Sequence, residues 1–176
     1  MSNITLLNES SISQNVDVIV NTTNRKSAPG GVCREIFKRT NIMDLMIEYT
    51  YFKRPLPDGS AVITAALKIK NAKYIIHSVG SDFSETPTAF KELFEAYYNS
   101  LCVLKENDLH SISFPLISSG IYSGDLENPV AESTKQCLLA YKKFISDYSD
   151  YEIDVKVCAY SPESMKEAKP VFESML

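Results

Sequence analysis

Two asparagines that follow a short apolar run are the first side chains in this sequence that could bind a ligand or orient a water molecule. Asn21 and Asn24 stand in NTTN at 21–24, directly after the run VDVIV. Each carboxamide offers a donor and an acceptor, which suits holding a sugar hydroxyl and orienting a water molecule beside it. The same side chains also form Asx-turns, which only shape a loop. These residues by themselves leave a ligand-binding role and a structural role open.

A second segment, PLISSGIYSG at 115–124, is rich in small residues and carries two glycines. Its backbone amides can approach a diphosphate without obstruction by side chains. Gly30 and Gly31 precede a helical pattern, where they would place free amides and the positive end of a helix near an anion. Tight turns and helix caps use glycine equally often. Neither loop alone therefore identifies an anion site.

The elements around these loops place both of them at one edge of a sheet. Apolar and β-branched runs predict strands at 4–7, 17–20, 61–65, 74–79, 111–114 and 154–159. Helical patterns begin at Gly30-Gly31, Asn41, Thr86-Pro87, Asn128-Pro129 and Ser161-Pro162. Strands that alternate with helices predict an α/β fold with a mostly parallel sheet covered on both faces. Ligands of such folds bind beyond the carboxyl ends of the strands, where both loops begin.

Three helical patterns carry apolar stripes at the spacing of a helix that lies on a sheet. The stripe after Thr86-Pro87 consists of Phe90, Leu93, Phe94, Tyr97, Leu101 and Leu104. The stripe after Asn128-Pro129 consists of Val130, Thr134, Cys137, Leu138 and Tyr141. The last helix offers Met165, Ala168 and Phe172. We expect these faces to be buried.

Composition narrows the class of protein. The chain has 176 residues, which fits one domain over 1–176, and no apolar run is long enough to cross a bilayer. No secretion signal marks the start, MSNITLLNES, so we expect a cytoplasmic protein. Four widely separated cysteines without a CxxC pair predict reduced thiols and no metal site. The net charge of −4 argues against nucleic acid as a partner. We also expect a monomer without membrane attachment.

Taken together, four segments resemble the macrodomain family, whose members bind ADP-ribose, and they occur in the family's order. They are VDVIVNTTN at 16–24, GGVC at 30–33, AVITAALKIKNAKYIIHSVG at 61–80 and ISFPLISSGIYSG at 112–124. GGVC and SGIYSG are most similar to the macrodomains of alphavirus replicase proteins, whereas many cellular hydrolases carry GGVD. The resemblance implies a three-layer α/β/α sandwich around a mixed, mostly parallel sheet, with ADP-ribose as ligand and no cofactor.

The resemblance also implies roles for individual residues. Asn24 would hold the distal ribose and help to place the attacking water, and Asn24, Gly31 and Tyr122 are the implied catalytic residues. Tyr122 would cover the distal ribose as a partial lid, and Tyr160 would stack on the adenine. Either tyrosine could instead serve only packing. The implied ligand contacts are Ser11, Ile12, Asn21, Asn24, Gly30, Gly31, Val32, Cys33, Pro115, Ser118, Ser119, Gly120, Ile121, Tyr122 and Tyr160.

Two departures from the family pattern bear on function. Most relatives carry Gly-Asp-Ile, with an aspartate that bonds the adenine amino group, where this chain has Ser10-Ser11-Ile12. Serine lacks the carboxylate charge, so weaker or less adenine-selective binding is expected. The aspartate and histidine of the cellular hydrolases are replaced by Cys33 and Phe37, which leaves no general base in that loop. We expect Cys33 to line the pocket, because no histidine nearby in the sequence would activate it as a nucleophile.

The resulting hypothesis is a mono-ADP-ribosyl hydrolase that acts on ester links to aspartate or glutamate. Deacetylation of O-acetyl-ADP-ribose would be the same ester chemistry on a free metabolite. Without a general base, catalysis would depend on a water positioned by the substrate's own phosphate. The alternative is a module that reads ADP-ribose, or a related nucleotide signal, without turning it over. A third reading, binding of RNA or poly-ADP-ribose ends, would need a basic surface beside the cleft.

Overall fold

The computed structural model describes residues 1–23, 32–40 and 56–176. The helix predicted from Asn41 and the site residues Asn24, Gly30 and Gly31 lie outside these ranges.

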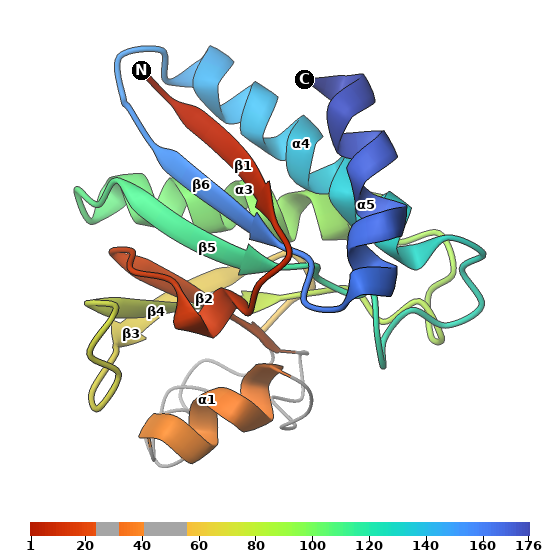
Figure 1. The fold of residues 1–176 in the computed structure, drawn as a ribbon, viewed down its shortest axis with the longest axis horizontal. Coiled ribbons are helices and arrows are strands. Elements are labelled where there is room, and N and C mark those ends of the chain that lie inside the picture. The colour runs from red at the N-terminus through yellow and green to blue at the C-terminus, as the bar shows by residue number, and fades with distance from the viewer. Residues whose placement is uncertain (24–31, 41–55) are drawn as a thin grey trace.

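One sheet runs through the middle of the molecule (Figure 1). Its strands are β1 (Asn3–Leu7), β2 (Val18–Thr23), β3 (Ala61–Ala65), β4 (Tyr74–Val79), β5 (Ser111–Pro115) and β6 (Asp154–Cys158). They lie in the order β1-β6-β5-β2-β4-β3. Every neighbouring pair is parallel except β3 with β4. The predicted mixed, mostly parallel sheet is confirmed.

Helices cover both faces of this sheet. Helix α1 (Val32–Thr40) lies on one side, whereas α3 (Phe90–Glu106), α4 (Pro129–Asp147) and α5 (Pro162–Met175) lie on the other (Figure 1). This arrangement confirms the predicted three-layer sandwich. None of the helices in the described ranges combines the length and the apolarity that a membrane span requires.

Successive side chains of the central strands pack alternately on the two faces of the sheet. Val18 and Val20 of β2 belong to the large apolar cluster beneath α3, α4 and α5. Ile19, between them, packs in a second cluster with Cys33 and Ile36 of α1. Successive side chains of a strand point to opposite faces, so a strand covered on both sides needs a continuous apolar run. The sequence VIV provides that run.

Four of the six residues in the predicted stripe of α3 are buried, whereas Phe90 and Phe94 are half-buried. The helix also begins later than its sequence indicates. Leu93, Tyr97, Leu101 and Leu104 are at most 1% exposed. Helix α3 begins at Phe90, and not at Thr86-Pro87, because residues 86–89 form a separate turn in which the amide of Ala89 donates to the carbonyl of Thr86. Ala89 has a ψ of 41°, which is not helical and prevents the two segments from joining.

Strand β2 extends further than predicted. Its polar residues Asn21, Thr22 and Thr23 pair with His77, Ser78 and Val79 of β4. The amide of Gly80 then donates to the carbonyl of Thr23 at 3.0 Å. Because β4 continues beside it, β2 gains ladder hydrogen bonds that outweigh the turn preference of its polar side chains. Most of the NTTN segment is therefore strand.

Candidate functional site

A pocket of about 210 Å³ opens beyond the carboxyl ends of four neighbouring strands. Thr23 comes from the end of β2, Gly80 directly follows β4, Pro115 ends β5 and Cys158 ends β6. In parallel sheets this edge is the usual place for a ligand, because the loops that leave the strands diverge there. The position of the pocket thus agrees with the prediction made from the order of elements.

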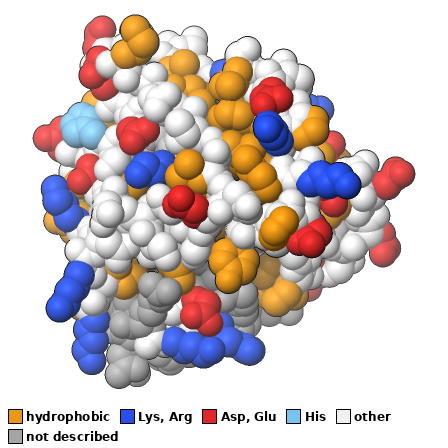
Figure 2. All heavy atoms as spheres, viewed as in Figure 1, with side chains coloured by type: hydrophobic (Ala, Val, Ile, Leu, Met, Phe, Trp, Pro, Cys, Tyr) orange, Lys and Arg blue, Asp and Glu red, His pale blue; other side chains and the backbone are white. Residues whose placement is uncertain are grey.

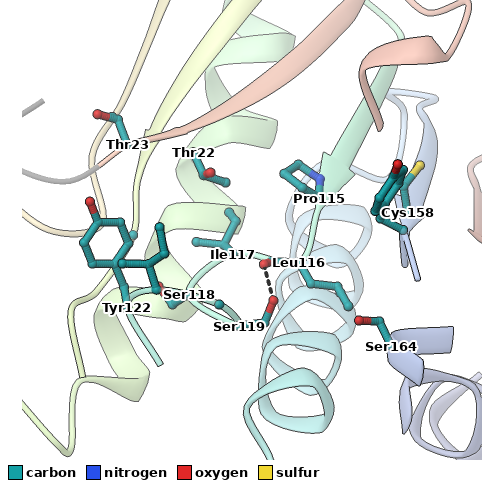
Figure 3. A pocket seen from close by; sticks show the side chains of 14 residues that line it. Thr22, Thr23, Pro115, Leu116, Ile117, Ser118, Ser119, Tyr122, Cys158 and Ser164 are labelled. Atoms are coloured by element: carbon teal, nitrogen blue, oxygen red, sulfur yellow. Dashed lines mark hydrogen bonds between the residues drawn. The ribbon is translucent and has the colours of Figure 1, made fainter. Parts of the chain in front are cut away.

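The loop 116–122 forms one wall of this pocket. Figure 3 shows Tyr122 and Thr23 at one end, Cys158 and Ser164 at the other, and the loop between them. Among the residues that the structure describes, the lining consists of Thr22, Thr23, Gly80, Pro115, Leu116, Ile117, Ser118, Ser119, Gly120, Ile121, Tyr122, Cys158, Tyr160 and Ser164. No acidic or basic side chain belongs to this set.

Two serine hydroxyls of the loop are used to hold its own shape. The hydroxyl of Ser118 donates to the carbonyl of Ser81 at 2.7 Å. The hydroxyl of Ser119 donates to the carbonyl of Leu116 at 2.7 Å, as the dashed line in Figure 3 shows. Ser118 adopts a φ of 58°, in the left-handed region that few side chains enter without support. The bond to Ser81 supplies that support.

Backbone amides of this loop are left available for a ligand. Within the ranges that the structure describes, the N–H groups of Ser118, Ser119, Gly120 and Ile121 donate to no protein acceptor. A Cβ placed on Gly120 would meet no atom within 4 Å, so the space beside this residue is open. Successive free amides at a left-handed turn form a concavity that suits a phosphate oxygen.

Gly80 lets the floor of the pocket approach the loop closely. A Cβ on this residue would lie 2.6 Å from Cγ2 of Ile117 and 2.8 Å from Oγ of Ser118. Both distances are far below van der Waals contact, so any side chain here would force Ile117 and Ser118 to shift. Opposite this contact, the carbonyl of Tyr122 accepts from the amide of Phe83 at 2.9 Å. The loop 116–122 is therefore fixed against the segment that follows β4.

Exposed apolar side chains stand at the rim of the pocket. Ile121 is 73% exposed and Tyr160 is 77% exposed. Tyr160 follows β6, where Nδ2 of Asn8 donates to the carbonyl of Ala159 at 2.8 Å and to that of Ser161 at 3.1 Å. This double contact holds the backbone on both sides of Tyr160, so its ring is displayed by a fixed segment. An exposed aromatic face beside a pocket suits a planar ring.

Not all of the predicted contacts line this pocket. Pro115, Ser118, Ser119, Gly120, Ile121, Tyr122 and Tyr160 do so. Ser11 and Ile12 lie in the short 3-10 helix η1 (Ser11–Ser13) and are buried. The carbonyl of Ser11 accepts from the hydroxyl of Ser113 at 2.7 Å, so η1 is tied to β5. Val32 begins α1.

Asn21 and Cys33 belong to a polar network on the α1 face of the sheet. Both side chains are fully buried, and Nδ2 of Asn21 lies 3.5 Å from Sγ of Cys33 and 3.0 Å from Nδ1 of His77. The other ring nitrogen of His77 lies 2.7 Å from Oγ1 of Thr64. Burial lowers the pKa of His77 to about 3, so the ring is neutral. Because Asn21 donates to Nδ1, the proton of the ring is on Nε2.

The thiol that does line the pocket is not prepared for nucleophilic attack. Burial raises the pKa of Cys158 to about 12, and the carboxylate of Glu9 acts in the same direction. The thiolate is the reactive species, and this environment suppresses it at neutral pH. The described wall can therefore bind an anion through neutral donors and orient water, but it offers no side-chain nucleophile of this kind.

Half of the lining residues in the described ranges were not predicted from the sequence. The missed residues are Thr22, Thr23, Gly80, Leu116, Ile117, Cys158 and Ser164. Thr23, Gly80 and Cys158 carry a positional signal, because each stands at or just beyond the carboxyl end of a strand. Ser164 lies in the first turn of α5, and nothing local in the sequence relates it to the loop 116–122.

Comparisons with known proteins agree with this geometry. The family model described as Macro domain matches residues 20–133. An uncharacterized protein of Thermoplasma volcanium is 35% identical over 79% of this chain and 75% of its own length. A polyprotein of Venezuelan equine encephalitis virus is 30% identical over 79% of this chain, although the match spans only 5% of the polyprotein. The viral match agrees with the alphavirus-like segments of the sequence.

Among solved structures, one titled as the Oceanobacillus iheyensis macrodomain with ADP superimposes with a TM-score of 0.80. It is 26% identical, and the match covers 95% of this chain and 88% of that one.

Proposed function

This chain belongs to the macrodomain family, and from that membership we propose that it binds ADP-ribose in the pocket beyond β2, β4, β5 and β6. The observation that carries the proposal is the row of free amides at 118–121, at the carboxyl edge of the sheet. A diphosphate offers several anionic oxygens, and backbone amides bind such oxygens without a counter-ion. The related macrodomain solved with ADP supports a nucleoside diphosphate as the ligand class.

The two ends of the pocket suggest an orientation for the ligand. Its diphosphate would lie along the amides of Ser118 to Ile121, with the distal ribose toward Tyr122 and Thr23. The adenine would then lie toward Cys158 and the exposed ring of Tyr160. In this orientation the apolar rim receives the planar base and the hydroxyl-bearing end receives the sugar.

We further propose that the protein hydrolyses esters that join ADP-ribose to aspartate or glutamate side chains. Such an ester is cleaved by water attack, which requires an oriented water but no protein nucleophile. Because the described lining residues are neutral and the pKa of Cys158 is high, the main contribution of the protein would be to position the water and the ester. The resemblance assigns the placement of water to Asn24, with Gly31 and Tyr122 beside it.

A non-catalytic reader is the second candidate function. It is favoured by one observation, namely that the described lining contains no group that is charged at neutral pH and could act as a general base. General base catalysis contributes roughly a hundredfold to ten-thousandfold in rate where it operates. A domain without it still retains full capacity to bind.

The test consists of two measurements on the same preparation. The first is a calorimetric titration with ADP-ribose, with adenosine as the control that lacks the diphosphate. The second follows release of label from a protein that carries glutamate-linked ADP-ribose. Tight binding with release supports the hydrolase, and binding without release on ester-linked substrates supports the reader. A chain that binds ADP-ribose no better than adenosine would refute the assignment of the amide row.

Asn24→Ala separates catalysis from binding. We expect a loss of turnover on the order of a hundredfold, with affinity for ADP-ribose reduced much less. Asn107→Ala is the matched control, because its amide donates only to the carbonyl of Val103 at the end of α3. Equal turnover in both variants would remove Asn24 from the mechanism.

A further inference from the structure

The backbone of Ile117 is held from beneath by two hydroxyls that come from different helices. Its amide donates to the phenol oxygen of Tyr97, on α3, at 2.8 Å. Its carbonyl accepts from the hydroxyl of Ser133, on α4, at 2.6 Å. The two hydroxyls are themselves 2.6 Å apart. Both backbone hydrogen-bonding groups of Ile117, its amide and its carbonyl, are thus bound by side chains of the helices beneath the loop 116–122.

The direction of every bond in this cluster follows from the donors that are present. Tyr97 accepts from the amide of Ile117, and Ser133 donates its single proton to the carbonyl of Ile117. The remaining contact must therefore be a donation from Tyr97 to Ser133. Each hydroxyl donates once and accepts once, so three hydrogen bonds run in one chain from the amide of Ile117 through Tyr97 and Ser133 to the carbonyl of Ile117. Successive hydrogen bonds in such a chain strengthen one another inside a protein.

The cluster is isolated from water and rigidly packed. Tyr97 and Ser133 are fully buried, and Ile117 is 1% exposed. The ring of Tyr97 meets the ring of Phe114 edge to face, with 5.2 Å between centroids. Burial raises the pKa of Tyr97 well above its ordinary value, so its proton remains in place for donation. Water cannot readily replace either hydroxyl here, and a lost partner leaves a buried backbone group unpaired.

We propose that Tyr97 and Ser133 are positioning residues that set the shape of the diphosphate-binding row of amides. Ile117 directly precedes Ser118, whose φ of 58° turns the chain, and the free amides at 118–121 follow from that turn. The carbonyl of Ile117 and the amide of Ser118 belong to the same planar peptide unit, so a rotation of this unit would change the direction in which the first free amide points. The inference rests on the proposed binding of ADP-ribose in this pocket.

The first test is Tyr97→Phe, which keeps the ring and removes only the hydroxyl. We expect affinity for ADP-ribose to fall about tenfold or more, because a buried amide that loses its acceptor drives the loop to rearrange. Ser133→Ala should act in the same direction by removing the donor to the carbonyl of Ile117. Calorimetry at a temperature where all variants are folded gives the affinities.

Two variants of α3 provide matched controls. Tyr98→Phe removes a phenol that bonds Asp147 at the surface, away from the loop. Ser100→Ala removes a buried hydroxyl that bonds only the carbonyl of Ala96 in its own helix. Both controls should keep wild-type affinity within about twofold, even where they lower stability. A loss of affinity in Tyr97→Phe that is matched by Ser100→Ala would mean general destabilisation, and would overturn the proposal.

Amide NMR spectra of the ligand-free protein test the positioning role without any ligand. In Tyr97→Phe, the Ile117 amide should exchange with solvent at least about tenfold faster, with shift changes concentrated at 116–122. Unchanged exchange at Ile117 would overturn the proposal. A wild-type chain that does not bind ADP-ribose would refute the proposed function, yet the same spectra would still show whether the two hydroxyls fix the loop.

Discussion

At the scale of single residues, this protein places neutral polar groups where other sites place charges. The pocket wall offers free backbone amides, and the hydroxyls of Ser118 and Ser119 hold the loop 116–122 in shape. The one buried histidine of the described core, His77, is neutral and bonds Asn21 and Thr64. Neutral donors avoid the desolvation penalty of buried charge and still bind an anion.

Substitutions of Gly120 test whether the free amides at 118–121 face the ligand. Gly120→Glu should weaken binding of ADP-ribose on the order of a hundredfold, because its carboxylate would repel the diphosphate across a short distance. Gly120→Ala is the control, since a Cβ at this position meets no neighbouring atom, and it should change affinity by less than about threefold. Calorimetric titration of both variants decides the matter. Wild-type affinity in Gly120→Glu would place the diphosphate elsewhere.

His77 makes stability depend on pH. Its pKa is about 3 in the folded chain and 6.5 in the reference state, so below pH 6.5 the unfolded chain binds a proton that the folded chain does not. Stability should therefore fall as the pH decreases from 6.5 toward 3, with a slope that approaches about 1.4 kcal/mol per pH unit from this group. His77→Gln should flatten the dependence between about pH 6 and pH 4.5. Urea unfolding at several pH values measures this slope, and an unchanged slope in the variant would contradict the assignment.

At the scale of elements, two helices whose first residues follow the same sequence pattern differ in their N-terminal capping hydrogen bonds. Ser161 precedes Pro162 and caps α5, because its hydroxyl accepts from the amide of Ser164 at 3.1 Å. Asn128 precedes Pro129 at the start of α4, yet its side chain accepts no capping bond. Both positions match the same sequence pattern, and only the first uses its side chain. Ser164 also lines the pocket, so the cap of α5 contributes to the site.

This difference predicts unequal effects on stability. Ser161→Ala should lower the free energy of unfolding by about 1 kcal/mol, since an amide in the first turn of α5 loses its acceptor. Asn128→Ala should lower it by less than about 0.5 kcal/mol, because no capping bond is lost. Urea unfolding of the two variants under the same conditions compares them directly. Equal losses would show that the local pattern, and not the observed bond, determines the effect.

At the scale of the whole molecule, the topology of the sheet assembles the candidate site, and the described lining contains no acidic or basic side chain. The order β6-β5-β2-β4 brings four carboxyl ends side by side, although these strands are far apart in the chain. Acidic and basic side chains are interspersed over the face seen in Figure 2. The net charge of −4 does not favour an anionic ligand. For the proposed binding of ADP-ribose, we therefore expect short-range hydrogen bonds from the described wall to supply most of the affinity.

A weak dependence on salt follows from this arrangement. Affinity for ADP-ribose should change by less than about threefold between about 50 mM and about 500 mM NaCl, because screening acts mainly on interactions between exposed charges. Calorimetry across this range measures the effect, with sodium sulfate at matched ionic strength as a check on competition by anions. A steep loss of affinity would mean that basic side chains outside the described wall contribute to binding.

The sequence by itself determined the alternation of strands and helices, the doubly covered sheet and the loop 116–122, because these features depend on local periodicity and glycine content. Only the tertiary structure decided that Asn21 pairs with His77, that α3 begins at Phe90, and that Tyr97 holds Ile117. The stripe on α3 already predicted that Tyr97 is buried, but not where its hydroxyl points. That direction depends on a contact with a residue 20 positions away, and the Asn21 contact spans 56 positions. Hydrogen bonds between distant segments leave no local pattern, because they form only when the packed sheet brings the partners together.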